Sequence, residues 1–214
     1  MECAYRERGK APWIPKGPPP ELVTLVQRKF IAPPMRILDI GSGEGQHAVY
    51  LAEQGFDVTG VDFSSKASTY ARKLATERSV QERCRFYVLD VLRVTELTRK
   101  KGFRLFDFVL EWGLLHFLMP EEREKYVQGL ASLVHSGANY LSLSFNDQAV
   151  EWGEPGQKYR TSTLTGANLY YSSYDELRDL FSPYFRVLDT RIRNTIFDNS
   201  PFHYTHNVLW MERK

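Results

Sequence analysis

Short apolar runs alternate along the chain with longer segments whose apolar residues recur at helical spacing. Five runs have the length of a buried strand: residues 37–40, 56–62, 86–91, 105–112 and 138–145. Helical periodicity lies between them, at residues 46–55, 65–79 and 121–134. Runs this apolar are typical of parallel strands covered on both faces. The pattern therefore predicts an α/β fold with a doubly wound parallel sheet.

The end of the chain departs from this alternation. Two β-rich runs, residues 184–193 and 202–212, follow a helical segment at residues 173–181. The connection between the two runs is too short for the helical crossover that parallel neighbours need. We therefore expect them to pair antiparallel.

A glycine-rich turn follows the first strand. Gly41, Gly43 and Gly45 stand at alternate positions, and Asp39 lies within the strand before them. The dinucleotide fingerprint needs its third glycine one residue later, and a phosphate-binding loop needs a Gly-Lys-Ser/Thr ending that is absent here. The turn therefore predicts a nucleotide-binding edge of another kind.

Acids mark the ends of the next three strands. Asp62 ends the second strand, 17 positions after Gly45, close to the spacing at which an acid meets a ribose diol. A carboxylate can accept hydrogen bonds from both hydroxyls of that diol. Asp90 ends the third strand, and Glu111 with Trp112 ends the fourth. Asp62 and Asp90 could each be only a helix cap.

The Asp-x-Gly-x-Gly-x-Gly sequence from Asp39 resembles motif I of the class I S-adenosylmethionine-dependent methyltransferases, and the likeness extends to about Phe145. It implies a single Rossmann-like sheet of seven strands, mostly parallel, with the last strand antiparallel beside the fifth. It also implies that the cofactor is S-adenosylmethionine and the product S-adenosylhomocysteine, and Asp39 suits the cofactor's ammonium group. The cofactor contacts are then expected at Asp39, Gly41, Ser42, Gly43, Gly45, Asp62, Phe63, Asp90, Val91, Glu111 and Trp112.

A narrower likeness points to small methyltransferases related to the thiopurine and tellurite-resistance enzymes. Three segments carry it: residues 11–13 (Ala-Pro-Trp), 110–116 and 201–204. The Asn-Pro-Pro-Tyr pattern of adenine and glutamine N-methyltransferases is missing after the fourth strand. The expected reaction is methyl transfer to a sulfur, nitrogen or oxygen atom of a small molecule. A protein or RNA methyltransferase on the same fold and a non-catalytic cofactor-binding module are the alternatives.

We expect one domain over residues 1–214, with two additions. Residues 1–34 form a proline-rich N-terminal arm and a helix, and residues 146–172 form an insertion on the substrate side. Loops at the carboxyl ends of strands face the ligand crevice in such sheets. The substrate pocket is expected to be lined by Trp13, Trp112, His116, Trp152 and Tyr159.

Two residues are candidates for proton transfer. His116 follows the fourth strand and can titrate near neutral pH, although packing or capping would equally explain it. Glu111 is the second candidate, or else a structural hydrogen-bond acceptor. The sequence has no spaced His/Asp cluster, so we expect no metal.

Composition narrows the range of partners. The 214 residues carry a net charge of +2 and are 43% hydrophobic and 25% charged, which is typical of a soluble protein. This balance does not favour a nucleic-acid partner. No apolar run reaches the length of a membrane span, and the N-terminus lacks the apolar core of a signal peptide. The two cysteines give no disulfide framework. These observations predict a cytoplasmic enzyme, and they leave its acceptor and oligomeric state undetermined.

Overall fold

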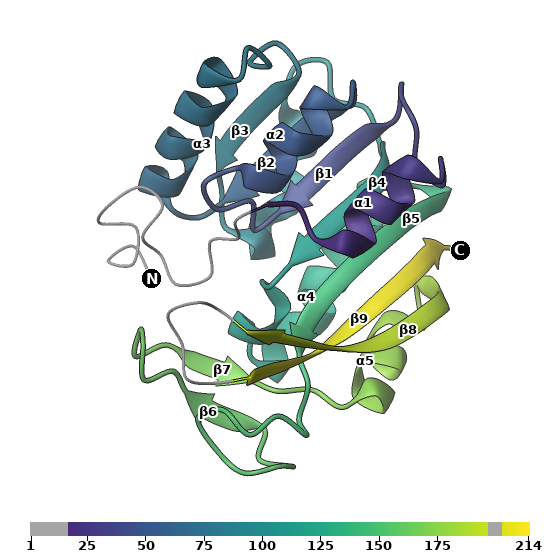
Figure 1. The fold of residues 1–214 in the computed structure, drawn as a ribbon. Coiled ribbons are helices and arrows are strands. Elements are labelled where there is room, and N and C mark those ends of the chain that lie inside the picture. Colours follow the sequence, from purple (N-terminus) through teal and green to yellow (C-terminus); the bar gives the residue numbers. More distant parts are fainter. Residues whose placement is uncertain (1–16, 197–202) are drawn as a thin grey trace.

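The computed structural model describes residues 17–196 and 203–214. Its centre is a seven-stranded sheet in the order β3-β2-β1-β4-β5-β9-β8 (Figure 1). The pairs among the first five strands are parallel, whereas β9 is antiparallel to both β5 and β8. The strands are β1 Arg36–Ile40, β2 Asp57–Asp62, β3 Cys84–Val88, β4 Phe106–Trp112, β5 Val134–Phe145, β8 Phe185–Ile196 and β9 His203–Arg213. The predicted sheet, with the last strand antiparallel beside the fifth, is confirmed.

Helices cover both faces of this sheet (Figure 1). They are α1 Pro20–Gln27, α2 Gln46–Glu53, α3 Ser65–Glu77, η2 Val91–Arg99, η3 Leu115–Phe117, α4 Pro120–Ala131 and α5 Tyr174–Phe181. Successive strand residues point to opposite faces, so Ile37 joins the apolar cluster under α1, α2 and α3, and Leu38 joins the one under α4 and α5. Both clusters are buried, which explains why the central strands read as continuous apolar runs.

Some boundaries differ from the sequence prediction. The third strand ends at Val88, because Asp90 caps a 3₁₀ segment by accepting from the backbone N–H of Leu92. The fifth strand begins four residues earlier than predicted, at Val134. Ser64 caps α3, as its hydroxyl accepts from the backbone N–H of Ala67 (3.1 Å).

The insertion at residues 146–172 contains a small sheet that the sequence pattern did not predict. Strands β6 Tyr159–Thr161 and β7 Asn168–Tyr170 pair antiparallel, apart from the main sheet. Each has only three residues, too few for an alternating pattern to stand out. In Figure 1 this pair lies beyond the ends of β8 and β9.

None of the helices in residues 17–196 and 203–214 is long and apolar enough to cross a membrane.

Candidate cofactor and acceptor site

The glycine turn is held at the carboxyl end of β2. The backbone N–H groups of Gly41 and Ser42 both donate to the carbonyl of Val61, at 2.8 and 3.0 Å. Gly43 donates its N–H to the Oδ2 atom of Asp62 (2.9 Å). The loop after β1 is therefore fixed against the end of the neighbouring strand, at the edge where open α/β sheets bind ligands.

Close packing also explains why two of these positions are glycine. Gly41 and Gly45 have φ values of +77° and +82°, a region that favours glycine. A Cβ atom at Gly45 would lie 2.8 Å from the Cβ of Ala71 in α3, and one at Gly41 would lie 2.9 Å from the Cβ of Leu114. Both residues let the chain pass close to its neighbours, whatever they contribute to ligand contact.

Asp62 connects three elements at this edge. Its Oδ2 accepts from Gly43, and its Oδ1 accepts from the backbone N–H of Ser64 (2.8 Å), which precedes α3. Its side chain is buried. The carboxylate thus fixes both the glycine turn and the start of α3, the position expected of a ribose-binding acid.

Asp39 is a buried acid beside Asp62. Asp39 is 1% exposed, and its Oδ2 atom has no hydrogen-bond partner among the described residues. Burial, and then the charge of Asp62, raise the pKa of Asp39 to about 7, which a hydrogen bond from the backbone of Ala48 only partly opposes. A cationic group nearby would favour the ionised form. The unpaired oxygen therefore fits the ammonium of an amino-acid ligand.

Asp39→Asn should stabilise the protein more at pH 8 than at pH 5. The raised pKa means that the folded state binds the extra proton between about pH 4 and pH 7, so the wild type loses stability as pH rises through 7. The variant has no such loss. We expect its advantage in the free energy of unfolding to grow by about 2–3 kcal/mol between the two pH values. Urea unfolding measures it, with Asp175→Asn on α5 as the exposed control. An advantage independent of pH would contradict the prediction.

Phe63 and Asp90, two further predicted cofactor contacts, are more exposed than Asp39 and Asp62. Phe63 is 43% exposed directly after Asp62. Asp90 is exposed and serves as the cap described above, whereas Val91 is buried. The cap uses the Oδ1 atom of Asp90, which accepts from Leu92 at 2.9 Å. Cap and ligand contact are compatible for Asp90.

Glu111 is engaged entirely within the fold. Its Oε1 accepts from the backbone N–H groups of Leu114 (2.6 Å) and Leu115 (3.0 Å), and its Oε2 accepts from the hydroxyl of Ser142 (2.5 Å). Burial raises its pKa, and these hydrogen bonds oppose the rise. This geometry agrees with the structural hydrogen-bond acceptor considered from the sequence, because Glu111 ties the turn after β4 to β5. The cofactor contact and proton transfer at Glu111 stay predictions.

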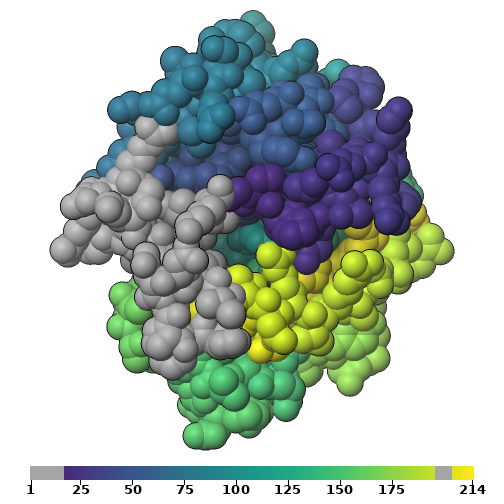
Figure 2. All heavy atoms as spheres, in the orientation of Figure 1, coloured from purple at the N-terminus to yellow at the C-terminus, as the bar shows by residue number. Residues whose placement is uncertain are grey.

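Trp112, at the end of β4, contacts His47 and Arg193. Its ring meets the His47 imidazole edge to face, with centroids 6.2 Å apart. The Arg193 guanidinium lies 5.5 Å from the Trp112 ring centroid and forms an ion pair with Glu21 of α1. In Figure 2 the surface is hollowed between the purple atoms of α1 and the yellow atoms of β8 and β9. The ion pair therefore joins α1 to β8.

His116 packs against aromatic rings. It is 5% exposed, and its imidazole centroid lies 4.6 Å from that of Phe117 and 4.0 Å from that of Phe145. Burial, and then His206 and Arg123, hold the pKa of His116 well below its usual value. His116 is thus neutral at pH 7, and the packing role considered from the sequence is present in the structure.

Phe145, at the end of β5, is the centre of a larger group of rings. Tyr171 stacks on it with centroids 4.8 Å apart and an interplanar angle of 10°. Tyr204 and His206 also stack on it, and Trp152 meets it edge to face. The insertion, β5 and β9 therefore build one aromatic wall.

The other residues predicted to line the substrate pocket are Trp152, Tyr159 and Trp13. Trp152 belongs to the aromatic wall, because it also packs on Tyr204. Tyr159 is 62% exposed and meets Tyr170, and together with Trp152 it lines a shallow hollow on the insertion. Trp13 lies outside the described residues.

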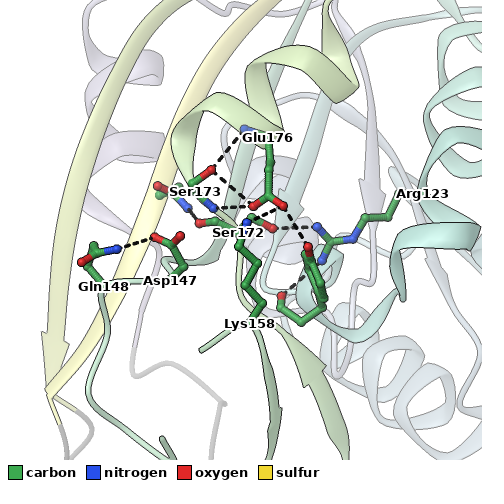
Figure 3. Close-up of polar contacts among 9 residues, drawn as sticks. Arg123, Asp147, Gln148, Lys158, Ser172, Ser173 and Glu176 are labelled. Atoms are coloured by element: carbon green, nitrogen blue, oxygen red, sulfur yellow. Dashed lines mark hydrogen bonds and ion pairs between the residues drawn. The ribbon is translucent and has the colours of Figure 1, made fainter. Parts of the chain in front are cut away.

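Arg123 of α4 anchors the insertion to the turn that carries His116. Its guanidinium donates to the carbonyls of Leu118, Leu115 and Tyr170 and to the Ser172 hydroxyl, at 2.6–3.2 Å. Figure 3 shows Arg123 reaching Ser172, with Glu176 of α5 facing Lys158 of the insertion beside it. Burial lowers the pKa of Arg123 to about 10, so it stays charged at neutral pH.

The sequence prediction did not include Arg123 or Arg160. Arg160 donates to five backbone carbonyls inside the insertion. The sequence prediction also left His47 without a role and gave His206 only a core or surface role. An isolated basic residue carries no periodic signal, so only the fold could place them. Within the described residues, no group of three or more His, Cys, Asp and Glu side chains could hold a metal ion.

Comparisons with known proteins identify the family of this chain. A family model described as a methyltransferase domain matches residues 37–137. An uncharacterized methyltransferase of Schizosaccharomyces pombe is 30% identical over 112 residues, covering 52% of this chain and 72% of the relative. The chain belongs to the S-adenosylmethionine-dependent methyltransferases.

A second relative of this methyltransferase is the 2-heptyl-1-hydroxyquinolin-4(1H)-one methyltransferase of Mycobacteroides abscessus. It is 29% identical over 195 residues, covering 88% of this chain and 77% of the relative. TehB from Haemophilus influenzae, at 13% identity, has the same fold, with a TM-score of 0.70 over 91% of this chain and 62% of TehB. This likeness agrees with the tellurite-resistance resemblance at the level of the fold.

The cofactor of this methyltransferase is S-adenosylmethionine. The Burkholderia thailandensis 1,6-didemethyltoxoflavin-N1-methyltransferase was solved with its acceptor and S-adenosylhomocysteine bound. It has 22% identity and a TM-score of 0.67 over 91% of this chain and 77% of that one. The residues present here fit the cofactor, since the unpaired oxygen of Asp39 suits an ammonium and Asp62 a ribose.

Proposed function

We propose that this methyltransferase transfers a methyl group to a heteroatom of a small, flat aromatic acceptor. The observation that carries the proposal is the wall around Phe145, in which Tyr171, Tyr204 and His206 stack on one ring at the carboxyl edge of the sheet. Aromatic rings prefer such offset-stacked partners, so a flat acceptor would find matching surface there. The substrates of two similar proteins, 2-heptyl-1-hydroxyquinolin-4(1H)-one and 1,6-didemethyltoxoflavin, support the same class.

We propose that the cofactor lies along the glycine turn, contacting Asp39, Ser42, Gly43, Asp62, Phe63, Asp90 and Val91. The cofactor supplies a methyl group bonded to a sulfonium sulfur. The acceptor atom attacks the methyl carbon in line with that bond, and the sulfur is the leaving group. Holding the acceptor atom in line with that bond is the main task of the protein. Trp112 would close the site on the acceptor side, where a ring face stabilises a nearby cation. We also propose that residues 1–214 form one domain and that the protein is cytoplasmic.

Incubation with labelled cofactor tests the proposal. The panel contains 2-heptyl-1-hydroxyquinolin-4(1H)-one, thiophenol, a selenol, aniline and 4-nitrophenol, with bulk tRNA and protein extract as macromolecular acceptors. We expect label in one or more of the aromatic small molecules and none in tRNA or protein. Labelling of tRNA or protein alone would support the macromolecular alternative. Cofactor binding without any transfer would support a non-catalytic module.

A further inference from the structure

We propose that two copies of this protein form a two-fold symmetric dimer through the outer edge of β8, whose strands pair antiparallel about Thr190. The seven-stranded sheet of one copy would then continue into the sheet of the other. This surface lies outside the proposed cofactor and acceptor sites, and the inference does not depend on the proposed function.

β8 is a long strand at the border of the sheet. It is the last strand in the sheet order, and among the described residues only β9 pairs with it (Figure 1). An edge strand presents a row of backbone N–H and C=O groups that can pair with another chain. Many proteins keep such strands very short, whereas β8 has 12 residues, Phe185–Ile196. β8 therefore offers an extended edge for an added strand.

Two large apolar side chains are exposed in the middle of this edge. Residues 188–192 are all exposed, and they include Leu188 (45%) and Ile192 (59%). Leu188 lies at a β-bulge, since the register between β8 and β9 shifts between Val187 and Asp189. Burial of apolar surface favours association, so an added strand that covers these side chains would stabilise the pair.

The charges on β8 are complementary to those of a second copy. Asp189 and Arg191 share one face of the sheet, because their partners on β9, Trp210 and Val208, pack in the same apolar cluster. A two-fold axis through Thr190, perpendicular to the sheet, places Asp189 of each copy opposite Arg191 of the other. Opposite charges that face each other across an antiparallel pair are favourable. This register therefore forms two favourable pairs, one on each side of the axis.

Neighbouring symmetric registers bring like charges together. An axis through Asp189 or through Arg191 places that residue opposite its own copy. An axis two residues after Thr190 places Arg191 opposite Arg193, again on both sides. Like charges directly opposite each other are destabilising. An axis through Leu188 falls on the bulge, where regular pairing is interrupted. The charge pattern thus favours the register centred on Thr190.

The same register brings the exposed apolar residues together, because it places Leu188 of each copy near Ile192 of the other. Pairing of a single strand buries less surface than the larger interfaces of permanent dimers, so we expect a dissociation constant of about 1–100 μM.

Charge reversals beside the axis test the register. Asp189→Arg leaves two basic positions beside Thr190, and Arg191→Asp leaves two acidic ones, so each variant alone opposes like charges. An equimolar mixture of the two variants can form a heterodimer in which both pairs are opposite in charge. Arg85→Asp on β3, the other edge strand, is the matched control. Sedimentation equilibrium measures the dissociation constant, and thermal unfolding checks that each variant is folded.

We expect wild type and Arg85→Asp to dimerise equally, and each β8 variant alone to dimerise at least about 10-fold more weakly. The mixture should recover to within about threefold of wild type. A wild type that is monomeric at about 200 μM would overturn the inference and leave this edge to another occupant. A dimer that neither β8 variant weakens, or a mixture as weak as its components, would also overturn it. If a variant does not fold, Asp189→Lys or Arg191→Glu replaces it in the same comparison.

Discussion

Asp62→Asn is expected to weaken binding of S-adenosylhomocysteine by about 10- to 100-fold, because hydrogen bonds to a charged acceptor are worth about 1.5–3 kcal/mol each. The carboxylate sits at the end of β2, held by the N–H groups of Gly43 and Ser64. We propose that it also receives the ribose hydroxyls of the cofactor. The amide keeps one acceptor oxygen but brings an NH₂ group to a site that already contains two N–H donors. Calorimetry at pH 7.5 measures the affinity.

The control for this variant lies on the same strand. Asp57 begins β2 at the opposite edge of the sheet, where its partly exposed side chain forms ion pairs with Arg36 and Arg85. Asp57→Asn removes the same charge and should leave cofactor affinity unchanged. Urea unfolding without ligand shows separately how much Asp62→Asn costs in stability. A folded Asp62→Asn with wild-type affinity would leave Asp62 with only a structural role.

Arg123→Met should lower the free energy of unfolding by about 3 kcal/mol or more, because each buried polar atom left without its hydrogen-bond partner costs about 1–3 kcal/mol and Arg123 pairs with several. Methionine has a similar length but donates no hydrogen bond. The carbonyls of Leu115, Leu118 and Tyr170 would then lose a buried donor. Because these carbonyls belong to the turn of His116 and to the insertion, we also expect turnover to fall. Urea unfolding followed by circular dichroism measures the change.

Arg178→Met is the matched control for Arg123→Met. Arg178 pairs with Asp175 and Asp179 on the exposed side of α5. Exposed ion pairs contribute about 0–1 kcal/mol, so this variant should unfold close to wild type. Equal effects of the two substitutions would show that Arg123 does not hold the insertion in place.

The central sheet could be predicted because its strands are buried on both faces. Ile37, Leu38 and Ile40 must all be apolar, since one side of β1 packs under α2 and the other under α4. The glycine turn and Asp62 could be predicted from the sequence because positive φ values and acids at strand ends depend on only a few neighbouring residues. The strands of the insertion, at three residues each, gave no such pattern.

The sequence by itself determined the sheet and the order of the strand-end residues, because burial and turn geometry constrain residue type locally, and its resemblance to a known family implied the cofactor. Only the tertiary structure decided what each polar side chain does. Glu111 is satisfied by Leu114, Leu115 and Ser142, which no spacing rule would join to it. His206 meets Phe145 because β9 returns beside β5, 61 residues later in the chain. Hydrogen bonding, desolvation and pKa depend on neighbours brought together by folding, so the roles of the histidines and acids follow from the fold.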